Sequence, residues 1–142
     1  QKTPPMETAL VETIRRHRAE DRVLIASFHS VTMRRFRRLA AARIATGANT
    51  QNMVSFVCHW RSGMQRFYKP PVDAFQVPES QFGIRVVTPK MVEIAHRHGI
   101  KVHVWTINEE ADIRRLLEWG VDGICSDYPD RVAKVLREMN RF

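Results

Sequence analysis

Apolar and polar residues follow two rhythms along the chain, and each rhythm predicts a different secondary structure. Short apolar runs rich in β-branched residues predict strands, whereas apolar residues three and four positions apart predict helices that bury one face. By these rules we expect strands at 23–27, 43–46, 74–77, 102–107 and 121–126. We expect helices at 4–19, 30–42, 89–98, 108–120 and 129–139. Strands joined through helices are normally parallel, so the pattern predicts an α/β fold with a parallel sheet.

Polar residues of the kind that cap helices mark the predicted helix starts. A side-chain oxygen at the N-cap accepts a hydrogen bond from a free N–H of the first turn. The expected N-caps are Thr3, Ser30 or Thr32, Thr88, Asn108 and Asp127. For Asp127 a second interpretation stays open, in which its carboxylate orients a residue of a binding pocket.

Residues 48–70 form a stretch that is too long for an ordinary connection. The apolar residues within it could form an amphipathic helix that Pro70 and Pro71 would end: Met53, Val54, Phe56, Val57 and Trp60. Two interpretations stay open. The stretch is either a plain additional helix or an elaborated loop that shapes the mouth of a substrate site.

The polar residues best placed for chemistry follow two neighbouring strands. Trp105, Thr106 and Asn108 come at the end of the strand 102–107, and Ser126 and Asp127 end the strand 121–126. In folds with parallel strands, binding sites lie beyond the C-terminal ends of the strands. A tryptophan there can form the wall of a pocket and donate one hydrogen bond, although core packing is the alternative.

The net charge of +8 raises the question of an anionic partner. The main basic run, residues 33–39, places Met33, Phe36 and Leu39 on one helical stripe and the arginines on the opposite face. We interpret that face as solvated and expect no nucleic-acid partner, because no stacking aromatic residues accompany it. A basic surface is also compatible with a membrane surface of anionic lipid headgroups.

Cysteines and histidines give no sign of a disulfide framework or a metal motif. Cys125 falls in a predicted core strand, so we expect a buried free thiol. His103 alternates in phase with Trp105, so it would point into the interior, where we expect a hydrogen-bonded core histidine rather than a ligand. His96 and His98 are two positions apart on a helix, so they do not face the same way.

Several segments together resemble the glycerophosphodiester phosphodiesterase family. VHVWTIN (102–108) and GVDGICSDYPD (120–130) are similar to the last two strands of that family, and VLIASFH (23–29) and AFQVPE (74–79) are similar to earlier parts. The resemblance implies a partial (β/α)8 barrel, with about the C-terminal four strand–helix units in residues 1–142. A complete barrel needs about 250 residues, and the chain begins QKTPP without an initiator methionine. We therefore expect a piece of a longer protein.

The same resemblance implies roles for six residues. Phe28, Gln76 and Trp105 would contact the substrate, with Phe28 and Trp105 as an apolar wall, and His29, Ser126 and Asp127 would form or orient the rim. The substrate would be a glycerophosphodiester, cleaved to glycerol 3-phosphate and an alcohol.

The family's catalytic residues have no counterpart in this sequence. Family members that hydrolyse phosphodiesters use histidines and carboxylates with a divalent cation, Mg²⁺ or Ca²⁺, in the N-terminal half of the barrel. No His-Arg-Gly or Glu-Asn-Thr stretch occurs here. We expect catalytic residues and metal ligands upstream, no metal bound by this chain alone, and no activity of this chain alone.

Two other functions compete with this interpretation. One is a non-catalytic binding or scaffolding domain of the same fold, and the other is a small α/β domain that binds nucleic acid through its arginines. In either barrel interpretation the first and last strands would expose unpaired edges, so we expect a homo-oligomer, most simply a symmetric dimer.

Overall fold

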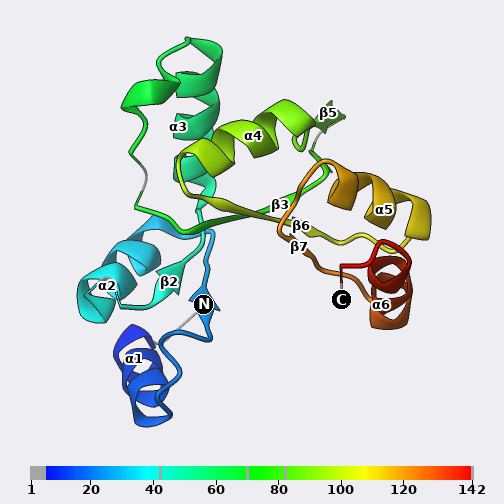
Figure 1. Ribbon diagram of the computed structural model, residues 1–142. Helices are drawn as coiled ribbons and strands as arrows, with labels where there is room; N and C mark the ends of the chain where they lie inside the picture. Colours follow the sequence, from blue (N-terminus) through cyan, green and yellow to red (C-terminus); the bar gives the residue numbers. More distant parts are fainter. Residues whose placement is uncertain (1–5, 42, 70, 82, 142) are drawn as a thin grey trace. The chain divides into compact units, whose positions relative to one another are not determined.

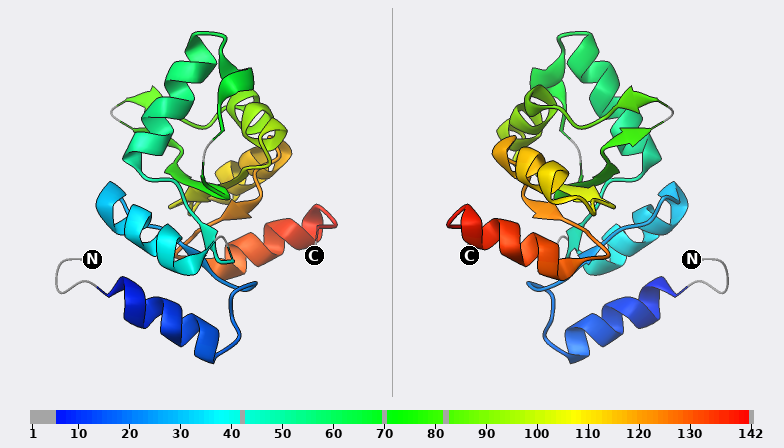
Figure 2. Two further views of the ribbon diagram at one scale, coloured as in Figure 1. Left: turned by 90° about the vertical axis from the view of Figure 1, so that its left-hand side faces the viewer. Right: turned by 90° about the vertical axis from the view of Figure 1, so that its right-hand side faces the viewer.

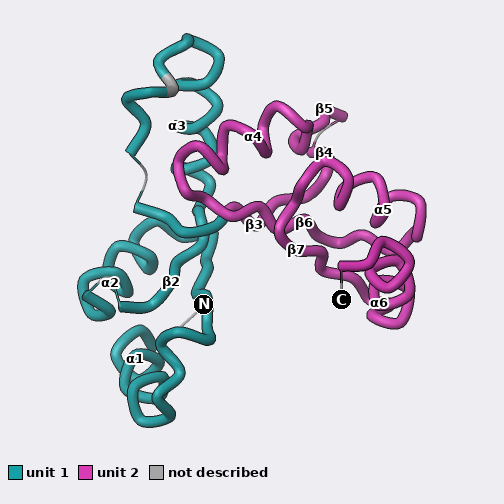
Figure 3. The backbone as a smooth tube through the Cα atoms, in the orientation of Figure 1, with its two compact units in different colours: residues 1–74 teal, residues 75–142 magenta. Residues whose placement is uncertain are grey.

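A computed structural model describes residues 6–41, 43–69, 71–81 and 83–141 of the chain (Figure 1). The chain divides into two compact units, residues 1–74 and 75–142, which we call the N-terminal and C-terminal units (Figure 3). The expected cap Thr3 lies outside the described residues. No helix in the described parts of the chain is long and apolar enough to cross a membrane.

Helices and short parallel strands alternate in the N-terminal unit. Its elements are α1 (Glu7–Arg16), β1 (Leu24–Ile25), α2 (Ser30–Ala40), β2 (Ala45–Thr46), α3 (Thr50–Arg61) and the 3-10 helix η1 (Gln65–Phe67). β1 and β2 are parallel, with Leu24 opposite Ala45 and Ile25 opposite Thr46. The pairing continues at a bridge between Gly47 and Ala74.

The core of the N-terminal unit lies where α1 packs against α2 (Figure 2). Each helix contributes its apolar stripe, as the spacing predicts. The buried cluster consists of Val11, Ile14, Phe36, Ala40 and Ile44. The arginines of α2 lie mostly on its other side, where Arg34, Arg35 and Arg38 are exposed.

α2 begins one residue earlier than its expected caps allow. Its N-cap position is His29, whose side chain makes no capping hydrogen bond, and Ser30 is already helical. The prediction of Ser30 or Thr32 as the cap is therefore wrong. Ser27 instead accepts a hydrogen bond from the N–H of His29, which fixes the turn into the helix.

The long stretch after β2 contains a regular helix, α3, as the apolar spacing predicts. A role of this stretch at the mouth of a substrate site stays a prediction. Asn49 and Asn52 form a capping box, a start signal that the sequence analysis missed. Phe56 is buried against Tyr68, with ring centroids 5.4 Å apart. The Tyr68 hydroxyl donates to the carbonyl of Asn52, and burial raises the pKa of Tyr68 to about 12.

The C-terminal unit contains the central sheet, in the strand order β3-β6-β7. Its elements are β3 (Ala74–Pro78, beginning in the N-terminal unit), β4 (Ser80–Gln81), β5 (Ile84–Arg85), α4 (Pro89–Arg97), β6 (Lys101–Trp105), α5 (Glu110–Glu118), β7 (Gly123–Ile124) and α6 (Pro129–Glu138). β6 and β7 are parallel and are joined through α5, so the predicted α/β fold with parallel strands is confirmed. Thr88 caps α4 as predicted.

The five expected strands correspond to β1, β2, β3, β6 and β7, and in the described residues each is followed by a helix, for β3 only after the hairpin β4–β5. The expected number of strand–helix units was about four. The short antiparallel hairpin β4–β5 also escaped prediction, because each strand has two residues and shows no alternation of apolar and polar positions. Gly83 in its turn has φ +75°, a conformation that favours glycine.

Alternate residues of β6, the middle strand of the sheet, differ sharply in burial. Val102 and Val104 of β6 are fully buried on the side where α4 packs, whereas His103 and Trp105 on the other side are half-buried. We call this second side the open face of the sheet. Because β7 pairs with β6 in parallel, Gly123 lies beside His103, and the alternation places Cys125 beside Trp105.

Two predictions about residues on the open face need correction. Cys125 is exposed, not buried, since its side chain is on this face. His103 is in phase with Trp105 as expected, but it is half-buried and not a core residue. Its ring lies over Gly123, where an added Cβ would come within 2.9 Å of the His103 Cδ2. Glycine is therefore the residue that fits beside this ring.

Asp122 fastens the start of β7 to the start of β6. Its carboxylate accepts hydrogen bonds from the backbone N–H of Val102 at 2.8 Å, from Lys101 Nζ at 2.9 Å and from His96 Nε2 at 2.7 Å. Burial by itself raises the pKa of Asp122, but the hydrogen bonds from Lys101, Val102 and His96 together outweigh it. The net result is a pKa below the usual value for aspartate.

We expect Asp122→Asn to lower the free energy of unfolding by about 1–3 kcal/mol at pH 7, because hydrogen bonds to a charged acceptor are lost. A pKa that is lower in the folded state gives stability that is present above the unfolded-state pKa of about 3.9 and is lost as pH falls through the folded value. The deficit of the variant should therefore shrink in acid.

Denaturant unfolding at pH 7 and at about pH 3 measures this difference, since the second pH lies below the unfolded-state pKa. Glu118→Gln, on the exposed side of α5, is the matched control and should have little effect at either pH. A deficit of Asp122→Asn that is equal at both pH values would contradict the assignment.

Candidate functional site

Asn108 links the C-terminal ends of β6 and β7. Its Oδ1 accepts hydrogen bonds from Ser126 Oγ and from the backbone N–H of Asp127, both at 3.0 Å. Its Nδ2 donates to Asp127 Oδ2 at 3.0 Å. The side chains that the sequence placed at two strand ends thus meet in one network.

This network replaces two predicted helix caps. The N-cap position of α5 is Glu109 and that of α6 is Tyr128, and neither helix has a side-chain capping hydrogen bond. The predictions of Asn108 and Asp127 as caps are therefore wrong. Their polar atoms are used between the two loops. The second interpretation of Asp127, as a residue that orients a pocket residue, stays a prediction. Ser126 Oγ also accepts from the N–H of Tyr128.

Arg131 adds a positive charge to the network and was missed in the sequence. Its Nη1 donates to the carbonyl of Asn108 at 2.8 Å and to Glu109 Oε1 at 3.3 Å. Its guanidinium lies 4.2 Å from the centre of the Tyr128 ring. The first turn of α6 therefore braces the loop after β6. An arginine two residues after Pro129 resembles any exposed helix residue, so no sequence signal marked it.

Trp105 is the last residue of β6 and lies half-buried on the open face. Thr106 follows it through a cis peptide bond and is exposed. An indole ring in this place combines an apolar surface with one N–H donor beside the polar network of Asn108. The role of Trp105 as a pocket wall stays a prediction.

Gln76 lies in the middle of β3 rather than at its end, because the strand continues through Pro78. It is half-buried between the buried residues Phe75 and Val77. The expected strand 74–77 is thus one residue longer, and the predicted contact of Gln76 with a substrate stays a prediction.

Glu79, interpreted from the sequence as a loop carboxylate, has a structural partner. Arg115 of α5 donates to both of its oxygens, at 2.9 and 3.1 Å. Arg115 also binds Asp112 and lies over the Trp119 ring at 4.8 Å. The hydrogen bonds that Arg115 donates to Glu79, and then to Asp112, raise the pKa of Arg115. This pair fastens the loop after β3 to α5.

Phe28 and His29 lie in the loop that follows β1, and both are exposed, Phe28 at 74%. Phe28 belongs to the N-terminal unit and Trp105 to the C-terminal unit. Their pairing in one wall, and the position of His29 at its rim, stay predictions.

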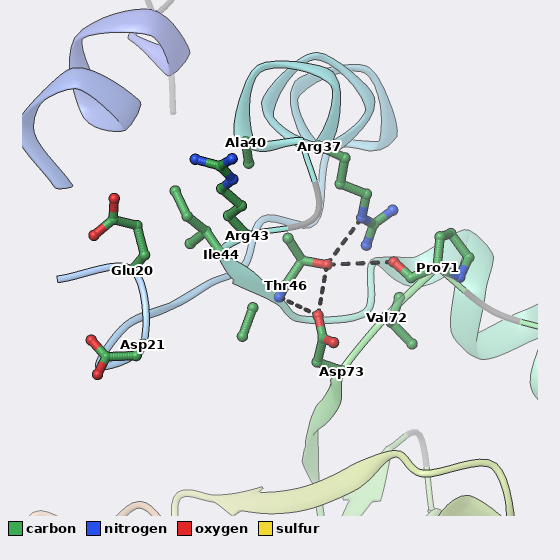
Figure 4. Close-up of a pocket in the computed structure, with 11 residues that line it drawn as sticks. Glu20, Asp21, Arg37, Ala40, Arg43, Ile44, Thr46, Pro71, Val72 and Asp73 are labelled. Carbon is green, nitrogen blue, oxygen red and sulfur yellow. Dashed lines mark hydrogen bonds between the residues drawn. The ribbon is translucent and has the colours of Figure 1, made fainter. Parts of the chain in front are cut away.

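A cavity in the N-terminal unit has a volume of about 520 Å³ (Figure 4). It lies at the N-terminal ends of the strands, between Glu20 and Asp21 before β1 and Asp73 before β3. Arg37 donates to Thr46 Oγ1 at 3.1 Å, and Asp73 accepts from the N–H of Thr46 at 2.7 Å. Burial lowers the pKa of Arg37, against the opposing effect of Asp73. These charges serve the fold, at the strand ends opposite to those where chemistry is expected.

No group of three or more histidine, cysteine or acidic side chains in the described part of the chain could hold a metal ion. We therefore assign no metal ligand to any described residue. Asp127 is bound by Asn108, Glu109 by Arg131 and Glu79 by Arg115.

The model of the Glycerophosphoryl diester phosphodiesterase family matches residues 3–131. The chain belongs to this family. A probable glycerophosphodiester phosphodiesterase 2 of Mycobacterium tuberculosis is 34% identical over 129 residues, which is 89% of this chain and 49% of that protein. A glycerophosphodiester phosphodiesterase of Caldanaerobacter subterraneus is 27% identical over 95% of this chain and 51% of its own length. The chain thus spans about half the length of these family members.

Solved structures of the family have the same fold. A putative glycerophosphoryl diester phosphodiesterase from Silicibacter pomeroyi superposes with a TM-score of 0.72 and 27% identity, over 95% of this chain and 44% of its own. An Oleispira antarctica phosphodiesterase in complex with the product sn-glycerol-3-phosphate has a TM-score of 0.68 and 22% identity, over 93% of this chain and 51% of its own.

We expect Asn108→Asp to destabilise the strand ends of this family member. The substitution keeps the acceptor for Ser126 but places a second carboxylate 3.0 Å from Asp127, where Asn108 Nδ2 now donates. Losing one such hydrogen bond and gaining a like-charge contact should cost about 1–3 kcal/mol at neutral pH.

A double-mutant cycle by denaturant unfolding checks this. Asp127→Asn alone should lower the free energy of unfolding by less than Asn108→Asp does. The double variant Asn108→Asp/Asp127→Asn restores an amide–carboxylate pair and should therefore recover most of the lost free energy of unfolding. Additive losses in the double variant would refute a direct interaction between these side chains.

Proposed function

We propose that the chain is the C-terminal half of the (β/α)8 barrel of a glycerophosphodiester phosphodiesterase. The family match over residues 3–131 carries this proposal, together with the share of about half that the chain covers in its relatives. Five strands each followed by a helix, with a sheet face left open, are what a piece of a closed barrel would contain. The remaining strands would come from polypeptide outside this sequence.

In this proposal the chain supplies the wall and rim of the substrate site. Trp105 and Phe28 provide apolar surface for the carbon atoms of a glycerophosphodiester, and Gln76 provides an amide for its hydroxyl or phosphate oxygens. His29, Ser126 and Asp127 form or orient the rim. The support is strongest for the last two, since Asn108 fixes both beside the end of the Trp105 strand.

The proposed reaction is hydrolysis of the phosphodiester. Water adds to phosphorus, the bond from phosphorus to the oxygen of the leaving alcohol breaks, and that oxygen gains a proton, which leaves glycerol 3-phosphate. A divalent cation, Mg²⁺ or Ca²⁺, would neutralise phosphate charge in the complete enzyme. The described residues do not form a site that fits such a cation, so its ligands and the residues that move protons would lie upstream. We propose that this chain alone is inactive.

The unpaired edges of the chain support a proposal about assembly. Within the described residues β1 and β7 are the outer strands of their sheets, and exposed edges invite pairing with another chain. We propose that the isolated chain associates with itself through these edges. Light scattering should give a mass above that of one 16.5 kDa chain at high concentration. A monomer throughout would count against it.

A non-catalytic binding or scaffolding domain of the same fold is the second candidate. The observation that favours it is the absence of a His-Arg-Gly stretch from the sequence and of an acidic or histidine cluster from the described residues. The two candidates differ in one property, which is turnover of a glycerophosphodiester by the protein that the complete gene encodes.

The test uses glycerophosphocholine with Mg²⁺ or Ca²⁺ and measures the release of glycerol 3-phosphate. We expect turnover by the complete encoded protein and none by the 142-residue chain. In the complete protein Trp105→Ala should raise KM by about tenfold, because it removes contact with the substrate, and Trp105→Phe should raise it less. Trp119→Phe, which packs against Arg115, is the control and should leave KM unchanged.

Two results would contradict the proposal. Turnover by the chain alone would show that its own residues are sufficient for catalysis. An inactive complete protein that still binds glycerophosphocholine would favour the scaffolding domain.

A further inference from the structure

The net charge of the chain is concentrated in one segment. Residues 22–72 contain nine lysines and arginines and not a single aspartate or glutamate. The chain has 23 basic and 15 acidic residues in all, so the basic and acidic residues outside this segment nearly cancel. A partner that contacts residues 22–72 alone therefore meets positive charge without interspersed acids.

The outward stripe of α3 lies in this segment and is apolar. Val54 is 58% exposed and Val57 37% exposed, and Cys58 beside them is also exposed. The first charged residue on the stripe is Arg61, at the last turn of the helix. The exposed side of a helix in a soluble protein normally carries charged residues instead.

The segment after α3 adds larger exposed apolar side chains between basic ones. Met64 is 51% exposed and Phe67 61% exposed. Arg61, Arg66 and Lys69 flank them and are exposed as well, and the Arg66 guanidinium lies 4.6 Å from the centre of the Phe67 ring. We call Val54, Val57, Arg61, Met64, Arg66 and Phe67 the α3–η1 surface.

This surface has a rigid support. Phe56 packs against Trp60 and Tyr68 beneath it, and Tyr68 is hydrogen-bonded to the backbone of α3. The capping box of Asn49 and Asn52 fixes the start of the helix. The exposed apolar side chains are thus held by a folded element and do not result from fraying.

We propose that the α3–η1 surface docks the protein on the surface of an anionic lipid bilayer. Apolar side chains would enter the boundary between headgroups and acyl chains, and the flanking arginines and lysine would bind the anionic headgroups. Charge complementarity favours an anionic bilayer as the partner, because residues 22–72 contain no acidic residue that would be repelled by it. A nucleic acid would leave Val54, Val57 and Met64 without a suitable contact.

Docking of this kind is independent of phosphodiester hydrolysis and does not rest on the proposed function. It would hold the protein at the bilayer from which lipid-derived diesters are released. Because vesicle binding is measured without substrate, a negative result leaves the enzymatic proposal untouched.

The test is co-sedimentation of the 142-residue chain with vesicles of phosphatidylcholine alone or with about one-third phosphatidylglycerol. We expect binding to the anionic vesicles only, weakened by salt. Arg61→Gln/Arg66→Gln/Lys69→Gln should reduce the partition coefficient by about 100-fold. Met64→Ser/Phe67→Ser, at exposed positions, should reduce it by at least about tenfold.

A control variant removes the same charge elsewhere. Arg16→Gln/Lys90→Gln/Arg97→Gln changes three exposed basic residues outside residues 22–72 and should alter binding less than about threefold. Circular dichroism checks that each variant is folded. If a multiple variant does not fold, the single variant Phe67→Ser is tested in its place.

Three outcomes would overturn the proposal. The first is no binding to anionic vesicles. The second is an equal loss in the control triple variant, which would mean that net charge alone is sensed. The third is a duplex oligonucleotide bound more tightly than the vesicles and released by the same three substitutions, which would make the surface a nucleic-acid site.

Discussion

One-sided burial of β6, the middle strand of the sheet β3-β6-β7, is the constraint on which the C-terminal unit depends. Val102 and Val104 are fully buried on the face where α4 packs, while His103 and Trp105 lie half-buried on the open face. Parallel sheets are usually covered on both faces. A sheet with one face left open therefore fits a part of a larger fold, and in the family to which this chain belongs a closed barrel would provide the cover.

Side-chain hydrogen bonds compensate for the shortness of the last strand. β7 has only two residues, too few for the backbone ladder to fix its position. Asp122 fastens its beginning to Val102 and Lys101, and Asn108 fastens its end through Ser126 and Asp127. The same bonds that stabilise the strand thus set the polar groups beside Trp105. Folding and the candidate site are coupled here through a few polar residues.

The sequence was sufficient for the elements whose signals are local. The helices α1, α2, α4, α5 and α6, the five strands and the cap Thr88 follow from spacing and residue type. The sequence was insufficient where a polar side chain could form hydrogen bonds either with its own helix or with a distant loop. Asn108 and Asp127 have the residue types of caps, yet they bind each other, because the two loops that carry them meet only after folding. Cys125 was expected in a core that requires cover on both faces of the sheet, and one face is open.

Thiol reactivity of Cys125 tests the open face most directly. In a Cys58→Ser variant at low concentration, Cys125 is the only cysteine. Its alkylation rate under native conditions should lie within about tenfold of the rate in the denatured chain, because an exposed thiol reacts without unfolding. A native rate slower by about 100-fold or more would mean that the face is covered within this chain. The proposal that the rest of a barrel covers this face of the sheet would then be wrong.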